Sequence, residues 1–267
     1  VYPQMYWKIC AEKERKEFIK ESHKILSNYI ERNKFDQKAV LIAGTGPSAD
    51  KLIGSESEYE DHWKIVCNSY VKSKWLSKFK PNFITAGDAV SHFGVARYAE
   101  VFRKDLIKFL RNNKNTLFFT TDRFGVLFKK HYPDVSDQIV GCPQTRSLSY
   151  DLVQKFELPA LDSTLNIHML PLASSLSDHI KLIGFDSKSP VKEENEDFWA
   201  HSSNFQYHDL VETGLVCHPS FDILRKMSTY SGFISSTYTQ MFGLKGQRKK
   251  VEILTPTFNP ALRFLDE

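Results

Sequence analysis

The residues that could carry chemistry begin with a strand that breaks at glycine. Residues 39–50 read AVLIAGTGPSAD. Such a break can turn backbone N–H groups outward, toward a negatively charged ligand. We therefore predict a phosphate site here, against the alternative that the glycines only satisfy a tight turn. The segment, called the glycine turn below, consists of Gly44, Thr45, Gly46, Pro47 and Ser48.

The glycine turn matches neither of the two commonest nucleotide fingerprints. It lacks the third glycine of a dinucleotide-binding motif, and no Lys-Ser or Lys-Thr follows as in a Walker loop. This disfavours NAD and ATP in their commonest binding modes.

Polar side chains stand at the ends of three further apolar runs. Asn68, Asp88 and Asp186 each close one of them. In a parallel sheet the ligand lies outside the carboxyl ends of the strands, so we expect these residues to meet the glycine turn in one cleft. Two such aspartates could hold Mg²⁺, although the chain has no Asp-x-Asp pair there; alternatively, each caps a helix or binds a sugar hydroxyl.

Three histidines lie in or beside a long segment without periodicity, residues 187–221. They are His201, His208 and His218. Histidine suits a general base near neutral pH, and long irregular segments beside a site are often lids. The alternative for each histidine is a surface or capping role.

The elements that must position these residues alternate along the chain. We expect strands at residues 39–43, 64–68, 81–88, 116–121, 180–186 and 249–254, and helices at 12–35, 71–79, 95–112 and 164–175, with an irregular section at 132–149. Alternation of this kind predicts an α/β, Rossmann-like, mostly parallel sheet with helices on both faces. We divide the chain into a leading amphipathic helix (1–36), a nucleotide-binding core (37–186), a lid or acceptor segment (187–221) and C-terminal helices with a final strand (222–267).

Composition narrows the class of protein. The 267 residues are 41% hydrophobic, and no apolar run reaches the roughly 20 residues of a membrane helix. The net charge of +4 is spread among mixed acids and bases, which argues against a nucleic-acid binder. The four cysteines lie far apart, as expected of a cytoplasmic protein without a zinc site. The basic cluster at residues 245–250 is either a solvated face or a contact for an anionic glycan or membrane headgroups.

The order of these motifs resembles a known group of enzymes. The glycine turn, the Cys67-Asn68 strand end, the run at 81–88 and the run at 181–186 are similar to the CMP-sialic acid dependent sialyltransferases of glycosyltransferase family 42. They are also similar to the DUF115 group, which includes motility accessory factors and MptE-like pterin pyrophosphokinases. The resemblance covers residues 39–221 and implies a GT-A-like variant of the Rossmann-like sheet.

The resemblance also implies roles for individual residues. Asn68 would contact the cytidine nucleotide beside Thr45, which replaces a family asparagine, and Ser163 and Thr164 would cradle the donor. The spacing of the family base points to His218; His201 matches the family motif better but lies early and ranks second, with His208 third. The family neutralises phosphate with tyrosine rather than a metal, which suggests Tyr207 or Tyr230, but Ser187 stands where a family tyrosine follows the Asp186 strand.

From this resemblance we predict a glycosyltransferase that needs no cofactor. It would transfer a nonulosonate-type sugar, sialic acid-like or Kdo, from a CMP donor to a glycan or lipid-linked glycan, with histidine as general base. Contact with the inner face of the membrane and an oligomeric state are left open. The alternatives are a pterin pyrophosphokinase that uses ATP and Mg²⁺, and a nucleotide-binding module without catalysis.

Overall fold

The computed structural model describes residues 12–33, 39–187, 201–217 and 219–263, and the side chains of 12–13 and 219–229 are left out of the description. Its centre is a seven-stranded sheet with the strand order β5-β4-β3-β2-β1-β8-β9. Every neighbouring pair in this sheet is parallel. The strands are β1 Ala39–Ala43, β2 His62–Cys67, β3 Phe83–Thr85, β4 Leu117–Thr121, β5 Ile139–Cys142, β8 His179–Ile183 and β9 Lys250–Ile253.

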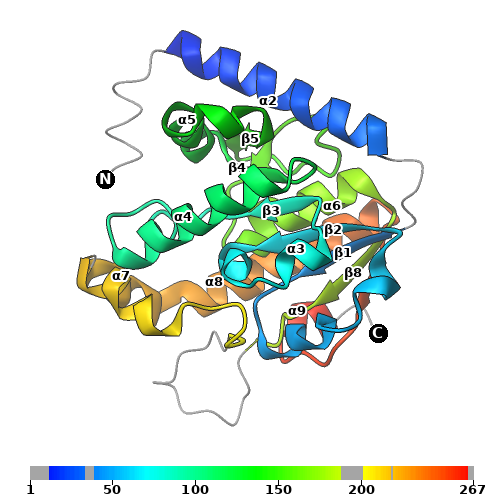
Figure 1. The fold of residues 1–267 in the computed structure, drawn as a ribbon. Coiled ribbons are helices and arrows are strands. Elements are labelled where there is room, and N and C mark those ends of the chain that lie inside the picture. The colour runs from blue at the N-terminus through cyan, green and yellow to red at the C-terminus, as the bar shows by residue number, and fades with distance from the viewer. Residues whose placement is uncertain (1–11, 34–38, 188–200, 218, 264–267) are drawn as a thin grey trace.

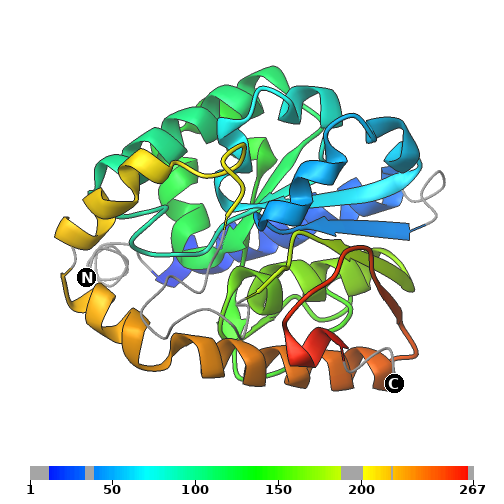
Figure 2. The same cartoon turned by 90° about the horizontal axis from the view of Figure 1, so that it is seen from below.

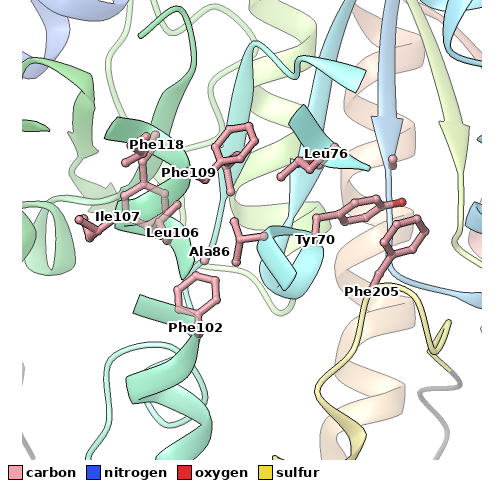
Figure 3. Packing of buried hydrophobic residues seen from close by; sticks show 14 of the residues in the cluster. Tyr70, Leu76, Ala86, Phe102, Leu106, Ile107, Phe109, Phe118 and Phe205 are labelled. Carbon is pink, nitrogen blue, oxygen red and sulfur yellow. The ribbon is translucent and has the colours of Figure 1, made fainter. Parts of the chain in front are cut away.

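Helices cover both faces of this sheet, as Figures 1 and 2 show, so the α/β prediction is confirmed. Alternate residues of each strand enter two separate cores: Leu41 and Ala43 face one, and Val40 and Ile42 face the other. The first core packs on α3 Leu76–Phe79, α4 Arg97–Asn112 and α5 Asp122–His131, and Figure 3 shows part of it. The second packs on η6 Leu165–Met169, α6 Leu170–Leu176, α8 Pro219–Gly246 and α9 Pro260–Arg263.

The leading helix α2, Glu12–Asn33, lies along the β5 edge of the sheet (Figure 1). Its Phe18 ring sits where a Cβ on Gly141 would come within 2.4 Å, so glycine in β5 permits the close approach. The hydroxyl of Ser22 accepts a hydrogen bond from the Gly141 N–H at 3.1 Å. The helix therefore covers the edge and also satisfies a backbone donor of its outermost strand.

Several elements differ from the predicted ones. We predicted an irregular section at 132–149, but the structure places the edge strand β5 there, and helix α5 precedes it. The expected helix over 71–79 is two short pieces, η4 Asn68–Lys72 and α3, and the helix over 164–175 opens with the π-helical turn η6. A two-stranded pair, β6 Gln144–Thr145 with β7 Leu158–Pro159, lies outside the main sheet.

Short 3₁₀ turns connect the remaining elements. They are η2 Pro47–Leu52, η3 Glu56–Tyr59, η5 Pro133–Gln138 and η7 His208–Leu210, and η7 leads into α7 Val211–Cys217. None of the helices in the described ranges has the length and apolar character that crossing a membrane requires.

Candidate functional site

A cavity of about 600 Å³ opens at the carboxyl ends of the strands. The chain runs from β1 outward to β5 and then returns to pair β8 against the other side of β1, so the topological switch lies between β1 and β8. Ligands of open α/β sheets bind at such a switch. Ten predicted site residues line the cavity: Gly44, Thr45, Gly46, Asn68, Asp88, Ser163, Thr164, Asp186, His201 and His208.

The glycine turn is held against the end of β8 by backbone hydrogen bonds. The N–H of Gly44 donates to the Ile183 oxygen at 2.8 Å, and that of Gly46 donates to the Gly184 oxygen at 2.9 Å. A Cβ on Gly44 would lie 2.5 Å from the Gly184 oxygen. Both N–H groups are thus engaged within the protein, and the glycines allow two strand ends to touch.

The carboxylate of Asp186 lies at the start of η2, where the predicted phosphate would sit. Ser48 donates to it from its backbone N–H, 3.3 and 3.2 Å from the two carboxylate oxygens, and from its hydroxyl at 2.9 Å. The Ser48 hydroxyl also lies 2.9 Å from that of Thr255. In this structure the protein supplies its own anion to the turn, while Pro47 and Ser48 lie behind the cavity lining.

Thr45 connects the glycine turn to His201. Its hydroxyl lies 2.8 Å from Nδ1 of His201, and its carbonyl accepts a hydrogen bond from the Ser202 N–H at 2.8 Å. Phe205, three residues on, stacks on Tyr70 with ring centroids 4.1 Å apart (Figure 3). Residues 201–207, which belong to the expected lid, are therefore anchored in the first core.

Three residues of the lining adopt backbone conformations that non-glycine residues rarely take. The φ angles are 53° at Asn68, 75° at Ser163 and 65° at Ser187. The Asn68 side-chain oxygen accepts a hydrogen bond from the Thr164 hydroxyl at 3.3 Å. Strained backbone of this kind persists where surrounding structure enforces it, and it concentrates at functional sites.

Asp88 caps the turn that follows β3. Its Oδ1 accepts hydrogen bonds from the N–H of Val90 at 2.9 Å and from the N–H of Ser91. Asp88 and Asp186 therefore each bind backbone N–H groups of the protein. In the part of the chain that the structure describes, no three His, Cys, Asp or Glu residues gather as a metal site would require.

The charged side chains in the described cavity lining are all acidic. Four carboxylates line it, from Asp88, Asp162, Asp186 and Glu212, and the described lining includes no Lys or Arg. Carboxylates accept hydrogen bonds from sugar hydroxyls or bind cations, whereas a bare anion would be repelled. An anionic ligand must therefore be met here by neutral hydroxyl and N–H donors, or arrive with a cation.

The two candidate tyrosines lie in different surroundings. The Tyr207 hydroxyl donates to Asp105 at 2.7 Å, away from the cavity lining, and burial raises its pKa. The Tyr230 hydroxyl lies 3.0 Å from that of Ser187, which does line the cavity. Only Tyr230 is therefore placed near a ligand. The exposed His208 lies on the cavity wall, while His218 falls outside the described residues.

Gln206 is a cavity residue that the sequence reasoning missed. Its side-chain oxygen accepts hydrogen bonds from the Tyr98 hydroxyl at 2.6 Å, the Tyr207 N–H at 2.9 Å and the Ser69 hydroxyl at 3.3 Å. Because the oxygen is fully used, its amide N–H₂ is the group that remains to face a ligand. Nothing in the sequence around Gln206 signals this role.

Cys67 also lines the cavity, where burial disfavours the thiolate, the nucleophilic form of its side chain. Burial raises its pKa to about 12, although the Thr45 N–H acts in the opposite direction. A thiol in this state packs as a small apolar group.

The basic cluster at residues 245–250 lies at the other edge of the sheet. Lys250 begins β9 opposite His179, the first residue of β8. Lys249 donates to the Ser174 oxygen at 2.8 Å and to the Asp178 carboxylate at 2.6 Å, so it binds the end of α6. Lys249 and Lys250 therefore lie at the amino end of β9, away from the carboxyl ends of the strands.

Comparisons of this chain with protein-family models, with curated proteins and with solved structures find no match.

Proposed function

We propose that this chain is a glycosyltransferase that moves a nonulosonate-type sugar from a CMP donor to a glycan or lipid-linked glycan. The observation that carries the proposal is the convergence of ten predicted residues, scattered over more than 160 positions, on one cavity at the topological switch. This convergence supports the resemblance on which the donor assignment depends. The donor sugar would be sialic acid-like or Kdo.

His201 is the residue that we propose as general base. It is half-buried in the cavity lining, and the Thr45 hydroxyl at 2.8 Å orients its ring. A base must lie within hydrogen-bond reach of the proton it takes. In this scheme His201 takes the proton of the acceptor hydroxyl, the hydroxyl oxygen bonds to the anomeric carbon, and CMP leaves.

Neutral donors would meet the charge of the departing phosphate. The hydroxyls of Thr45, Ser163 and Thr164 belong to the cavity lining, and Tyr230 reaches it through Ser187. Hydrogen bonds to a developing oxyanion are strong in a site with little water. Tyr230 would thus do the work that a tyrosine after the Asp186 strand does in the family.

The carboxylates favour one other candidate function, pyrophosphoryl transfer from ATP with Mg²⁺. Four carboxylates without Lys or Arg in the described lining suit a nucleotide that arrives with a divalent cation. The described residues do not form a cation site by themselves, because no three His, Cys, Asp or Glu among them lie together. The cation would have to be held largely by substrate phosphates.

Thermal unfolding with nucleotides separates these functions. CMP, CDP, UDP, GDP, ADP and ATP are added with and without Mg²⁺; a ligand at 100 times its Kd stabilises by about 2.7 kcal/mol. We expect stabilisation by CMP that EDTA does not remove, followed by CMP release from a CMP-sugar when a glycan is added. Stabilisation only by ATP with Mg²⁺ would instead favour the pyrophosphokinase, and no stabilisation by any nucleotide would refute both.

Turnover of variants then tests the base. His201→Ala should lower kcat by roughly 10²–10⁴-fold, the usual contribution of a general base. The matched control is His131→Gln, an exposed histidine at the end of α5, which should leave turnover unchanged. Full activity in His201→Ala would move the role to His208 or His218.

A further inference from the structure

His92 is a buried histidine that the proposed chemistry does not use. It follows β3 within the turn that Asp88 caps, and it lines the cavity with only 3% of its surface exposed. Its ring packs on Phe102 of α4, with ring centroids 4.5 Å apart. Arg103 donates to the backbone oxygen of His92 at 3.1 Å, so both its ring and its backbone are fixed.

One hydrogen bond settles which ring nitrogen of His92 carries the proton. The backbone N–H of Asp88 donates to Nδ1 at 3.1 Å. Nδ1 must therefore be an acceptor, and the proton of the neutral ring is on Nε2. Within the described residues, Nε2 has no hydrogen-bond partner, although the ring borders the cavity.

Burial favours the neutral form of this ring. It lowers the pKa of His92 to about 4, although the Asp88 carboxylate acts in the opposite direction. The neighbouring His168 differs, because both of its ring nitrogens are fully buried, have no hydrogen-bond partner in the described part of the chain and do not line the cavity. His92 thus presents one fixed N–H donor to the cavity, whereas His168 presents none.

Asp88 supplies an acceptor from the same turn. Its Oδ1 takes the two backbone N–H groups of the turn, and no hydrogen bond to its Oδ2 is found among the described residues. A donor and an acceptor from one turn match a hydroxyl group, which can accept one hydrogen bond and donate another. The carboxylate-rich lining likewise suits an uncharged, hydroxyl-bearing part of a ligand.

We infer that His92 and Asp88 form a sugar-hydroxyl subsite, in which His92 Nε2–H donates to a hydroxyl oxygen and the Asp88 carboxylate accepts from that hydroxyl. That the hydroxyl belongs to a sugar rests on the proposed function. It comes from the nucleotide ribose, the transferred sugar or the acceptor glycan. His92 is then a ligand-contacting residue whose neutral ring binds and orients the substrate without taking its proton.

Nuclear magnetic resonance of ¹⁵N-histidine-labelled protein tests this assignment directly. At pH 7 we expect the His92 ring, assigned through its loss in His92→Asn, to be the neutral Nε2–H form. A charged ring or an Nδ1–H form would overturn the proposal whatever the enzyme does.

Three probes then identify the source of the hydroxyl. CMP carries the ribose, a CMP-linked sialic acid adds the transferred sugar, and lactose added with CMP represents a neutral acceptor. A shift of the Nε2–H signal that first appears with one probe assigns the subsite to that component. If none of the three probes shifts the Nε2–H signal, the proposed subsite is wrong. If the signal responds but no sugar is transferred, the subsite stands and the proposed transferase fails.

Two substitutions separate binding from folding. His92→Asn keeps an acceptor near the position of Nδ1 but removes the donor, and should weaken binding of the responding probe roughly 3- to 10-fold, as for one neutral hydrogen bond. His92→Gln places an amide near the position of Nε2 and should restore most of the affinity. Equal Kd values for wild type and a folded His92→Asn would contradict the subsite, with His131→Asn as the remote control.

Discussion

Replacing Gly46 by alanine tests whether the glycines of the glycine turn are needed for the close contact between the ends of β1 and β8. Gly46 has φ −63° and ψ 162°, a conformation open to any residue, so alanine there causes no backbone strain. The added Cβ would instead lie 2.1 Å from Oδ2 of Asp186 and 2.7 Å from the Gly184 oxygen. One of these two groups must move.

The cost follows from what that movement breaks. Overpacking of this kind costs about 1–3 kcal/mol. Displacing Asp186 also weakens its hydrogen bonds from Ser48, worth about another 1–3 kcal/mol because the acceptor is charged. We expect Gly46→Ala to lower the free energy of unfolding by about 3 kcal/mol, which corresponds to a Tm loss of roughly 6–12 °C in a chain near this size.

Urea and thermal unfolding measure this loss, with Gly214→Ala as the matched control. Gly214 also lines the cavity, but it is helical and the nearest atom to its added Cβ is 3.8 Å away, on Val90. Alanine there should stabilise by about 0.5–1 kcal/mol. In the double variant with Asp186→Ala, part of the Gly46→Ala cost should disappear. Wild-type stability of Gly46→Ala would refute the contact argument.

Variants at four further residues probe groups around the sheet. Burial lowers the pKa of His168 to about 3, below the value of about 6.5 in an unfolded chain. The unfolded state therefore binds more protons, and the free energy of unfolding falls as the pH drops below about 6.5. His168→Leu should remove this slope of up to about 1.4 kcal/mol per pH unit, as measured by urea unfolding at about pH 4–7. Tyr207→Phe should lower the free energy of unfolding by about 1 kcal/mol and leave turnover unchanged. Tyr230→Phe should slow turnover, and equal effects of the two substitutions on kcat would contradict the placement of the two tyrosines. Arg15→Ala should destabilise by about 1–3 kcal/mol, because Arg15 contacts the buried Asp122 carboxylate at 3.0 Å, and Arg15→Lys should recover part of this in thermal unfolding.

The strand pattern made most of the fold predictable. The run at residues 39–43 is apolar throughout, and the run at 180–183 is apolar except for Lys181, as expected of strands covered on both faces; a glycine follows each run and marks the ligand edge. β5 escaped prediction because its four residues, Ile-Val-Gly-Cys, are short and contain glycine. Its strand character comes from pairing with β4 and from packing under α2, which are contacts between distant residues.

The sequence predicted where the candidate site lies better than it predicted which residues line it. Strand ends identified Asn68, Asp88 and Asp186, because parallel topology forces them together. His92 and Gln206 were missed, since their importance depends on which of their atoms other residues already bind. The glycine turn shows the same limit: its sequence is compatible with a phosphate or with a carboxylate of the protein, and only the position of Asp186 distinguishes the two.

The covering of β5 by α2 bears on assembly as well as on packing. An open parallel sheet has two outer strands whose unpaired backbone groups can recruit strands from other molecules. At one edge, Ser22 occupies the Gly141 N–H and α2 blocks access; at the other, β9 carries the charged residues Lys250 and Glu252. Because the first edge is covered by a separate helix and the second is protected by charges within the strand, removal of α2 should promote strand-to-strand association that starts from β5.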